Sequence, residues 1–136
     1  MWAVIDTSVY IDHWERGLHR DTLEQVRKAF IVRHSAVVLC ELRRVARTRG
    51  AERTVERLHR LARDPWAPTP ADWWESGRLI RTLGDAHDWD PVKRRAIQND
   101  ALIALTARRH GATVVTSTRA DFELLGQRLR VAVLVV

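Results

Sequence analysis

Short apolar runs separated by long helical stretches constrain the fold of this 136-residue chain more than any other feature. Short apolar runs predict buried strands at 2–5, 113–116 and 131–135, the last two rich in β-branched residues, and a weaker strand at 30–32. Helical periodicity fills the intervals at 8–15, 20–30, 35–48, 51–63, about 70–86 and 91–110. Connections of this length favour crossovers between parallel strands. The pattern therefore predicts an α/β fold with a mainly parallel sheet of about four to five strands, flanked by helices.

The length suits a single domain spanning residues 1–136, with no repeat and no low-complexity linker. The chain carries 23 Lys and Arg against 17 Asp and Glu, a formal net charge of +6, and all but two of the basic residues are arginine. Guanidinium groups bind phosphates in a bidentate fork, so this excess favours a nucleic-acid partner. A solvated basic surface explains the same composition equally well.

Cysteine and histidine usage excludes several site classes. Cys40 is the only cysteine, so neither an intrachain disulfide nor a cysteine-based zinc site is expected. No histidine pair has zinc-ligand spacing, and no Gly-rich phosphate loop or nucleophile motif occurs. The N-terminus lacks a basic region followed by a long apolar run, and the apolar run at 131–136 is too short to span a bilayer. We therefore expect a soluble, cytoplasmic protein with no membrane partner.

Three carboxylates stand out by their context, namely Asp6, Glu41 and Asp100. Asp6 closes the first predicted strand, where it could cap the next helix. Glu41 lies on a mostly apolar helical stripe, from which it could reach Arg44. Asp100 lies in the apolar stretch IQNDALIALTARRHG, and an unpaired buried charge there costs several kcal/mol. Asp100 therefore needs a partner, either an arginine or a metal ion shared with the other acids.

A shared metal ion has a definite chemical implication. Clustered carboxylates raise one another's pKa unless a cation offsets their charge. Oxygen-only ligands favour a hard ion, Mg²⁺ or Mn²⁺, which keeps several waters and commonly bridges to a phosphate. An acidic cluster on a basic chain thus predicts metal-assisted hydrolysis of a phosphodiester.

Three segments carry a resemblance to a known family: VIDTSVYID at 4–12, SAVVLCELRR at 35–44 and NDALIALTARRHGATVVTSTRADFELL at 99–125. In this order and with these separations they resemble the signature blocks of PIN-domain proteins, in particular the VapC-type toxins of bacterial toxin–antitoxin pairs. The three segments make up about a third of the chain. It implies a three-layer PIN fold, a Mg²⁺- or Mn²⁺-dependent endoribonuclease acting on RNA, a homodimer, and a cognate antitoxin that holds the enzyme inactive.

The resemblance also implies the site residues. Position by position, the acids of the family's metal site correspond to Asp6, Glu41 and Asp100, with Asp121 as a further acid. The supporting positions are Thr7, Ser8, Asn99, Thr116 and Thr118. Thr118 departs from the family, which usually has Asn or Asp there, and a threonine brings no charge. Whether one or two metal ions bind therefore stays open, as does whether Asp121 contributes or only caps a helix beginning near Phe122.

Two further questions stay open at this point. Arg43, Arg44 and Arg47 begin an arginine-rich stretch and are candidate RNA contacts, although a solvated face or pairing with antitoxin acids explains them too. The main rival to a ribonuclease is a catalytically impaired PIN module that binds RNA or a regulatory protein without turnover. An aspartyl-nucleophile phosphatase is disfavoured, because Ser8 stands where that mechanism requires a second Asp.

Overall fold

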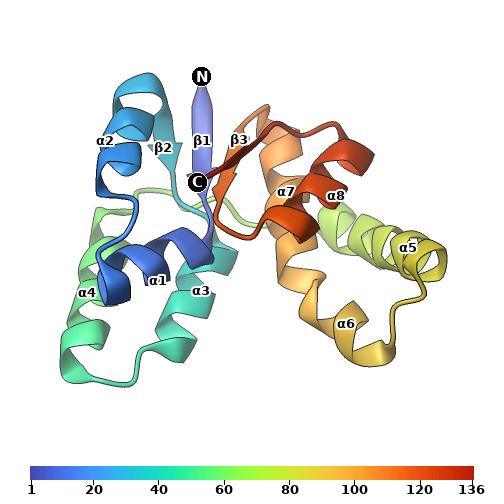
Figure 1. The fold of residues 1–136 in the computed structure, drawn as a ribbon, viewed down its shortest axis with the longest axis horizontal. Helices are drawn as coiled ribbons and strands as arrows, with labels where there is room; N and C mark the ends of the chain where they lie inside the picture. The colour runs from blue at the N-terminus through green and yellow to red at the C-terminus, as the bar shows by residue number, and fades with distance from the viewer.

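A four-stranded parallel sheet forms the centre of the computed structural model, which describes residues 1–136 (Figure 1). The strands lie in the order β2-β1-β3-β4. Their bounds are β1 (Trp2–Ile5), β2 (Ile31–Arg33), β3 (Thr113–Thr116) and β4 (Val133–Val135). All three neighbouring pairs are parallel. The predicted α/β class is confirmed, and the sheet has four strands with none antiparallel.

Eight helices make the connections between the strands and flank the sheet. Their bounds are α1 (Thr7–Arg16), α2 (Arg20–Ala29), α3 (Ala36–Val45), α4 (Arg49–Leu61), α5 (Pro70–His87), α6 (Pro91–Ala96), α7 (Gln98–His110) and α8 (Arg119–Leu129). In Figure 1 the first four helices lie on one side of the strands and the last four on the other, which gives three layers. None of the helices combines the length and the apolar composition that crossing a bilayer requires.

The predicted single helix at 91–110 is wrong in one respect, because the structure has two helices there. Ile97 separates α6 from α7, with φ −84° and ψ −6°, and its side chain is almost fully buried. Its carbonyl oxygen accepts the N–H of Ala101, so α7 begins immediately after it. Periodicity does not mark a break of one residue, since the burial of Ile97 continues the apolar pattern across it.

The break explains the position of Asp100. This residue lies in the first turn of α7 rather than in a helix interior. A carboxylate is favourable there because the unpaired N–H groups give the helix N-terminus a partial positive charge. The apolar run that follows, from Ala101 to Ala107, is buried at every position. Helix α7 packs against α5, α8, β1 and β3, so Asp100 enters the site from the most deeply buried helix of the fold.

Close packing of α8 against β4 at Gly126 gives a stability prediction. A Cβ atom at this position would lie 2.7 Å from a methyl group of Val133 and 2.9 Å from the carbonyl oxygen of Val131. This backbone oxygen belongs to the short segment that joins α8 to β4, so it cannot move without shifting that connection. We therefore expect Gly126→Ala to lower the free energy of unfolding by about 1–3 kcal/mol, measured by urea denaturation. Gly77→Ala in α5 is the control, because its added Cβ meets nothing within 4 Å, and it should stabilise the protein by about 0.5–1 kcal/mol. Equal effects of the two substitutions would contradict the packing argument.

Candidate functional site

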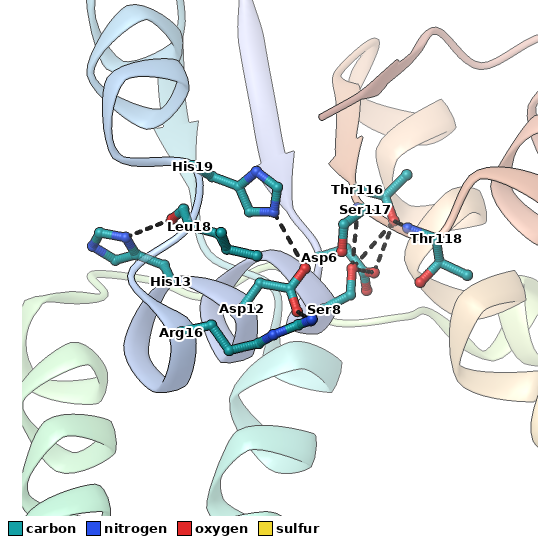
Figure 2. Close-up of polar contacts among 10 residues, drawn as sticks. All are labelled: Asp6, Ser8, Asp12, His13, Arg16, Leu18, His19, Thr116, Ser117 and Thr118. Carbon is teal, nitrogen blue, oxygen red and sulfur yellow. Dashed lines mark hydrogen bonds and ion pairs between the residues drawn. The ribbon is translucent and has the colours of Figure 1, made fainter.

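The carboxyl ends of the two central strands, β1 and β3, meet at a buried hydrogen-bonded cluster (Figure 2). Asp6 follows β1 directly and is only 3% exposed. Its Oδ2 atom accepts a hydrogen bond from Ser8 Oγ at 2.7 Å and another from Thr116 Oγ1, at the end of β3, at 3.0 Å. Asp6 occupies the N-cap position of α1, yet its side chain makes no capping hydrogen bond. Two side-chain hydroxyl groups therefore hold the carboxylate, and the backbone N–H groups of Thr7 and Ser8 at the start of α1 also lower its pKa.

The pKa of Asp6 reflects these surroundings. Burial raises the pKa of its carboxyl, because the ionised form loses hydration, and the hydroxyl donors Ser8 and Thr116 lower it in part. The same hydroxyls fix the rotamer of the carboxylate. Ser8 Oγ is itself positioned by the backbone N–H of Ser117 at 3.2 Å.

Glu41 reaches the same region from α3. Its Oε1 atom accepts a hydrogen bond from Thr7 Oγ1 at 2.7 Å, so residues 34 positions apart in sequence are joined next to Asp6. No ion pair connects Glu41 with Arg44, which was the structural alternative for this acid. One oxygen of the half-buried carboxylate is thus engaged, and the chain gives Glu41 a fixed orientation without neutralising its charge.

Asp100 has neither the arginine partner that its apolar context suggested nor any side-chain hydrogen bond. Burial raises the pKa of its carboxyl to about 8, and the negative charges of Asp6, Glu41 and Asp121 add to the increase. The positive charge of Lys93 opposes it. Four carboxylates from separate elements therefore lie within electrostatic reach of one another, and Asp100 bears most of the repulsion.

Asp121 lies in the first turn of α8, which begins at Arg119 and not near Phe122. Its side chain accepts a hydrogen bond from Lys93 Nζ at 2.7 Å and makes no capping hydrogen bond. The capping explanation is therefore wrong, and an ion pair replaces it. Lys93 was not among the residues predicted from the sequence, where its only local signal is that it is one of two lysines in an arginine-rich chain.

The remaining predicted residues differ in their exposure and in their hydrogen bonds. Thr118 is exposed at the N-cap position of α8, and its backbone N–H donates to Thr116 Oγ1 at 3.0 Å. Asn99 is half-buried in the first turn of α7, and its side chain makes no hydrogen bond. The three candidate RNA contacts are exposed and form no ion pair, namely Arg43, Arg44 and Arg47.

Thr116 ends β3 and contacts the site, so its replacement should change the stability of the protein. The residue is fully buried, donates to Asp6 Oδ2 and accepts from the N–H of Thr118. Replacing it with the isosteric Val leaves both partners without their bond, so Thr116→Val should lower the free energy of unfolding by about 1–3 kcal/mol, measured by urea denaturation.

Thr106→Val is the matched control for this prediction. The Thr106 hydroxyl is also buried, but it donates only to the Leu102 carbonyl of its own helix. That carbonyl keeps its helical partner, so a change below about 0.5 kcal/mol is expected. An equal loss of unfolding free energy in the two variants would mean that the hydrogen bond from Thr116 to Asp6 does not contribute to stability.

The donor chemistry of the site fits a hard divalent cation. Its four carboxylates provide oxygen ligands only, and three of them, Asp6, Glu41 and Asp100, have no cationic partner. No three of the chain's acidic, histidine or cysteine side chains lie close enough to hold one ion jointly in this conformation. Mg²⁺ needs no such triad, because it is commonly bound through one or two carboxylates and keeps several waters.

The geometry defines an α/β domain with an acidic site at the carboxyl end of a parallel sheet. A family model described as "PIN domain" matches residues 3–126. The chain belongs to the PIN-domain family. The match spans the four carboxylates of the site.

Solved structures show the same fold over almost the whole chain. The VapBC-1 structure from nontypeable Haemophilus influenzae is 17% identical, with a TM-score of 0.74 over 99% of this chain and 98% of the other. VapBC2 from Rickettsia felis, bound to a DNA fragment from its promoter, gives 19% identity and a TM-score of 0.68 over 98% and 97%. VapBC-5 from Mycobacterium tuberculosis, a member of a family of toxin–antitoxin systems, gives 23% and 0.63 over 99% and 98%. No curated protein sequence matches the chain significantly.

Proposed function

We propose that this protein is a VapC-like toxin, a Mg²⁺- or Mn²⁺-dependent endoribonuclease that a cognate antitoxin holds inactive. The observation that carries the proposal is the convergence of Asp6, Glu41 and Asp100 at one end of the sheet in a PIN-family chain. The chain has a formal charge of +6, so the overall composition does not account for a cluster of acids at this site. A bound cation would offset the repulsion among these carboxylates, which supports a metal site at this position.

Each carboxylate has a definite role in this proposal. Asp6 and Asp100 hold the ion, directly or through waters. Asp6 is suited to this because Ser8 and Thr116 occupy only its Oδ2 atom, which leaves Oδ1 free of side-chain donors. Glu41, oriented by Thr7, accepts a proton from the attacking water. When bound, a divalent cation supplies charge stabilisation to the phosphoryl group and to the leaving oxygen.

The basic surface provides a path for RNA. Arg43, Arg44 and Arg47 are exposed on α3 and in the turn after it, and none of them forms an ion pair. Glu41 lies on the same helix, so phosphates bound by these guanidinium groups lie on the helix that also supplies an acid of the site. Arg43 also lines an open cavity of about 590 Å³ between α3 and α4. Phosphate contacts of this kind bind the backbone without reading sequence.

The antitoxin part of the proposal is supported by the structural neighbours. VapBC-5 of Mycobacterium tuberculosis is described as belonging to a family of toxin–antitoxin systems, and its chain covers almost all of this one. Homodimer formation and a cytoplasmic location belong to the same proposal. Isolation of the protein with the product of a neighbouring short reading frame tests this part directly.

The experiment that tests the function is cleavage of RNA by the purified protein with Mg²⁺ or Mn²⁺. We expect cleavage that EDTA abolishes and that Asp6→Ala prevents. Sequencing of RNA ends after brief expression of the wild type and of Asp6→Ala would then identify the target. Binding of RNA without any metal-dependent cleavage would favour the alternative, a PIN module without turnover. Undiminished cleavage in EDTA would contradict the proposed mechanism.

A further inference from the structure

One cation is already built into the acidic site. The Nζ atom of Lys93, on α6, lies 2.7 Å from Asp121 Oδ1, on α8. The two side chains are 36% and 25% exposed, so the pair is partly shielded from water. Both charges act on Asp100, Asp121 unfavourably and Lys93 favourably. The ion pair is therefore part of the electrostatic environment of the site and not a remote surface contact.

The position of the Lys93 ammonium is fixed from several directions. Helix α6 is capped by the side chain of Asp90, which accepts the backbone N–H of Lys93 itself at 2.8 Å. The ammonium also lies 5.5 Å from the ring centroid of Trp89, a distance at which the aromatic face attracts a cation. The break at Ile97 separates α6 from α7 and gives Lys93 its own short helix. A lysine held by its backbone, an aromatic ring and a carboxylate is unlike the unpaired arginines of α3.

We propose that Lys93 is the resident cation of the site, that it keeps Asp121 out of metal coordination, and that the site consequently binds a single divalent ion per chain. This inference rests on the proposed function to the extent that the acids bind a metal. It assigns a positioning role to Lys93 and removes Asp121 from the metal ligands.

Two observations about the carboxyl end of β3 support a single ion. Thr118, on the segment that follows the strand, is exposed and brings no charge. Asp121 does carry a charge, but its Oδ1 atom is engaged by an ammonium. Lys93 leaves the Oδ2 atom of Asp121 open, but a divalent ion bound there would lie close to the ammonium that stays on Oδ1. Like charges at such separations disfavour one another strongly in a partly buried site.

The test is the number of Mn²⁺ ions bound per chain at pH 8, counted by electron paramagnetic resonance of the free ion. We expect one ion for the wild type. Lys93→Met frees Asp121 and removes a positive charge, so it should bind a second ion or bind the first about tenfold more tightly. Lys93→Arg keeps the charge and should behave as the wild type. Lys28→Met is the control, because it removes the only other lysine, an exposed residue on α2.

A second variant keeps the inference testable should Lys93→Met fail to fold, which circular dichroism would reveal. Asp121→Asn should still bind one ion, because Asp121 is not a ligand in the wild type. Three results would each overturn this inference while leaving the proposed function intact. They are loss of the bound ion in Asp121→Asn, two bound ions in the wild type, and a folded Lys93→Met that binds Mn²⁺ as Lys28→Met does. A wild type that binds no Mn²⁺ at all would overturn the metal-dependent function together with it.

Discussion

Asp100→Asn is expected to abolish RNA cleavage and, at the same time, to stabilise the metal-free protein at pH 8. The loss of activity should be at least about a hundredfold, because the substitution removes a charged ligand while keeping the shape of the side chain. The gain in stability has a different origin. In the folded protein Asp100 faces three other acids with only Lys93 to offset them, and the neutral amide escapes that repulsion.

The pH dependence of the stability follows from the direction of the pKa shift. Folding raises the pKa of Asp100 from 3.8 to about 8, so the native state binds the proton more tightly than the unfolded state. Its contribution to stability is fully present below pH 3.8 and is lost as the pH rises towards 8. The asparagine variant has no such loss, so its advantage should grow over this interval. We expect an advantage on the order of 2 kcal/mol at pH 8, a figure reduced for the solvent around a half-buried carboxylate.

Urea denaturation at several pH values and cleavage assays in Mn²⁺ check the two halves of this prediction. Asp88→Asn is the control, because it makes the same change of charge at an exposed residue in the left-handed region, which asparagine adopts readily. Asp88→Asn should change neither the RNA-cleavage activity nor the pH dependence of the stability. If Asp100→Asn cleaved RNA at the wild-type rate, Asp100 would not belong to the machinery.

Mn²⁺ is expected to raise the melting temperature of the wild type by about 5–10 °C at pH 8, and by less than about 2 °C at about pH 5. An ion bound only to the folded state stabilises it by mass action. Carboxylates bind the ion when deprotonated, so protons compete with it. The pKa of Asp100, raised to about 8, extends this competition well above pH 4, and burial raises the pKa of Asp6 as well. The stabilisation should consequently increase across the interval in which the metal-free protein loses stability.

Thermal melts in EDTA and in millimolar Mn²⁺ measure this effect. Asp100→Asn provides the matched comparison, because it lacks both the ligand and the titrating group, and its melting temperature should depend little on the ion. A shift of equal size at both pH values, or an equal shift in Asp100→Asn, would place the ion outside the acidic site.

Local patterns were sufficient to predict the strands and most helices of this protein. The short apolar run at Trp2–Ile5 and the helical stretch after it are encoded within a few residues, so the strand-to-helix transition at Asp6 could be predicted directly. Parallel pairing followed from the length of the connections. The break at Ile97 was missed because a residue that ends one helix and begins another can keep its place in the apolar pattern.

The sequence by itself determined the α/β class and the parallel sheet, and it singled out Asp6, Glu41 and Asp100 as candidate site acids through their local context and their place in the family's blocks. Only the tertiary structure decided the partners of those acids. Thr7 meets Glu41 across 34 residues, Thr116 meets Asp6 across 110, and Lys93 meets Asp121 across 28. These contacts form because packing brings the ends of different elements to one edge of the sheet. The charge balance of the site depends on such distant neighbours, which a linear pattern does not specify.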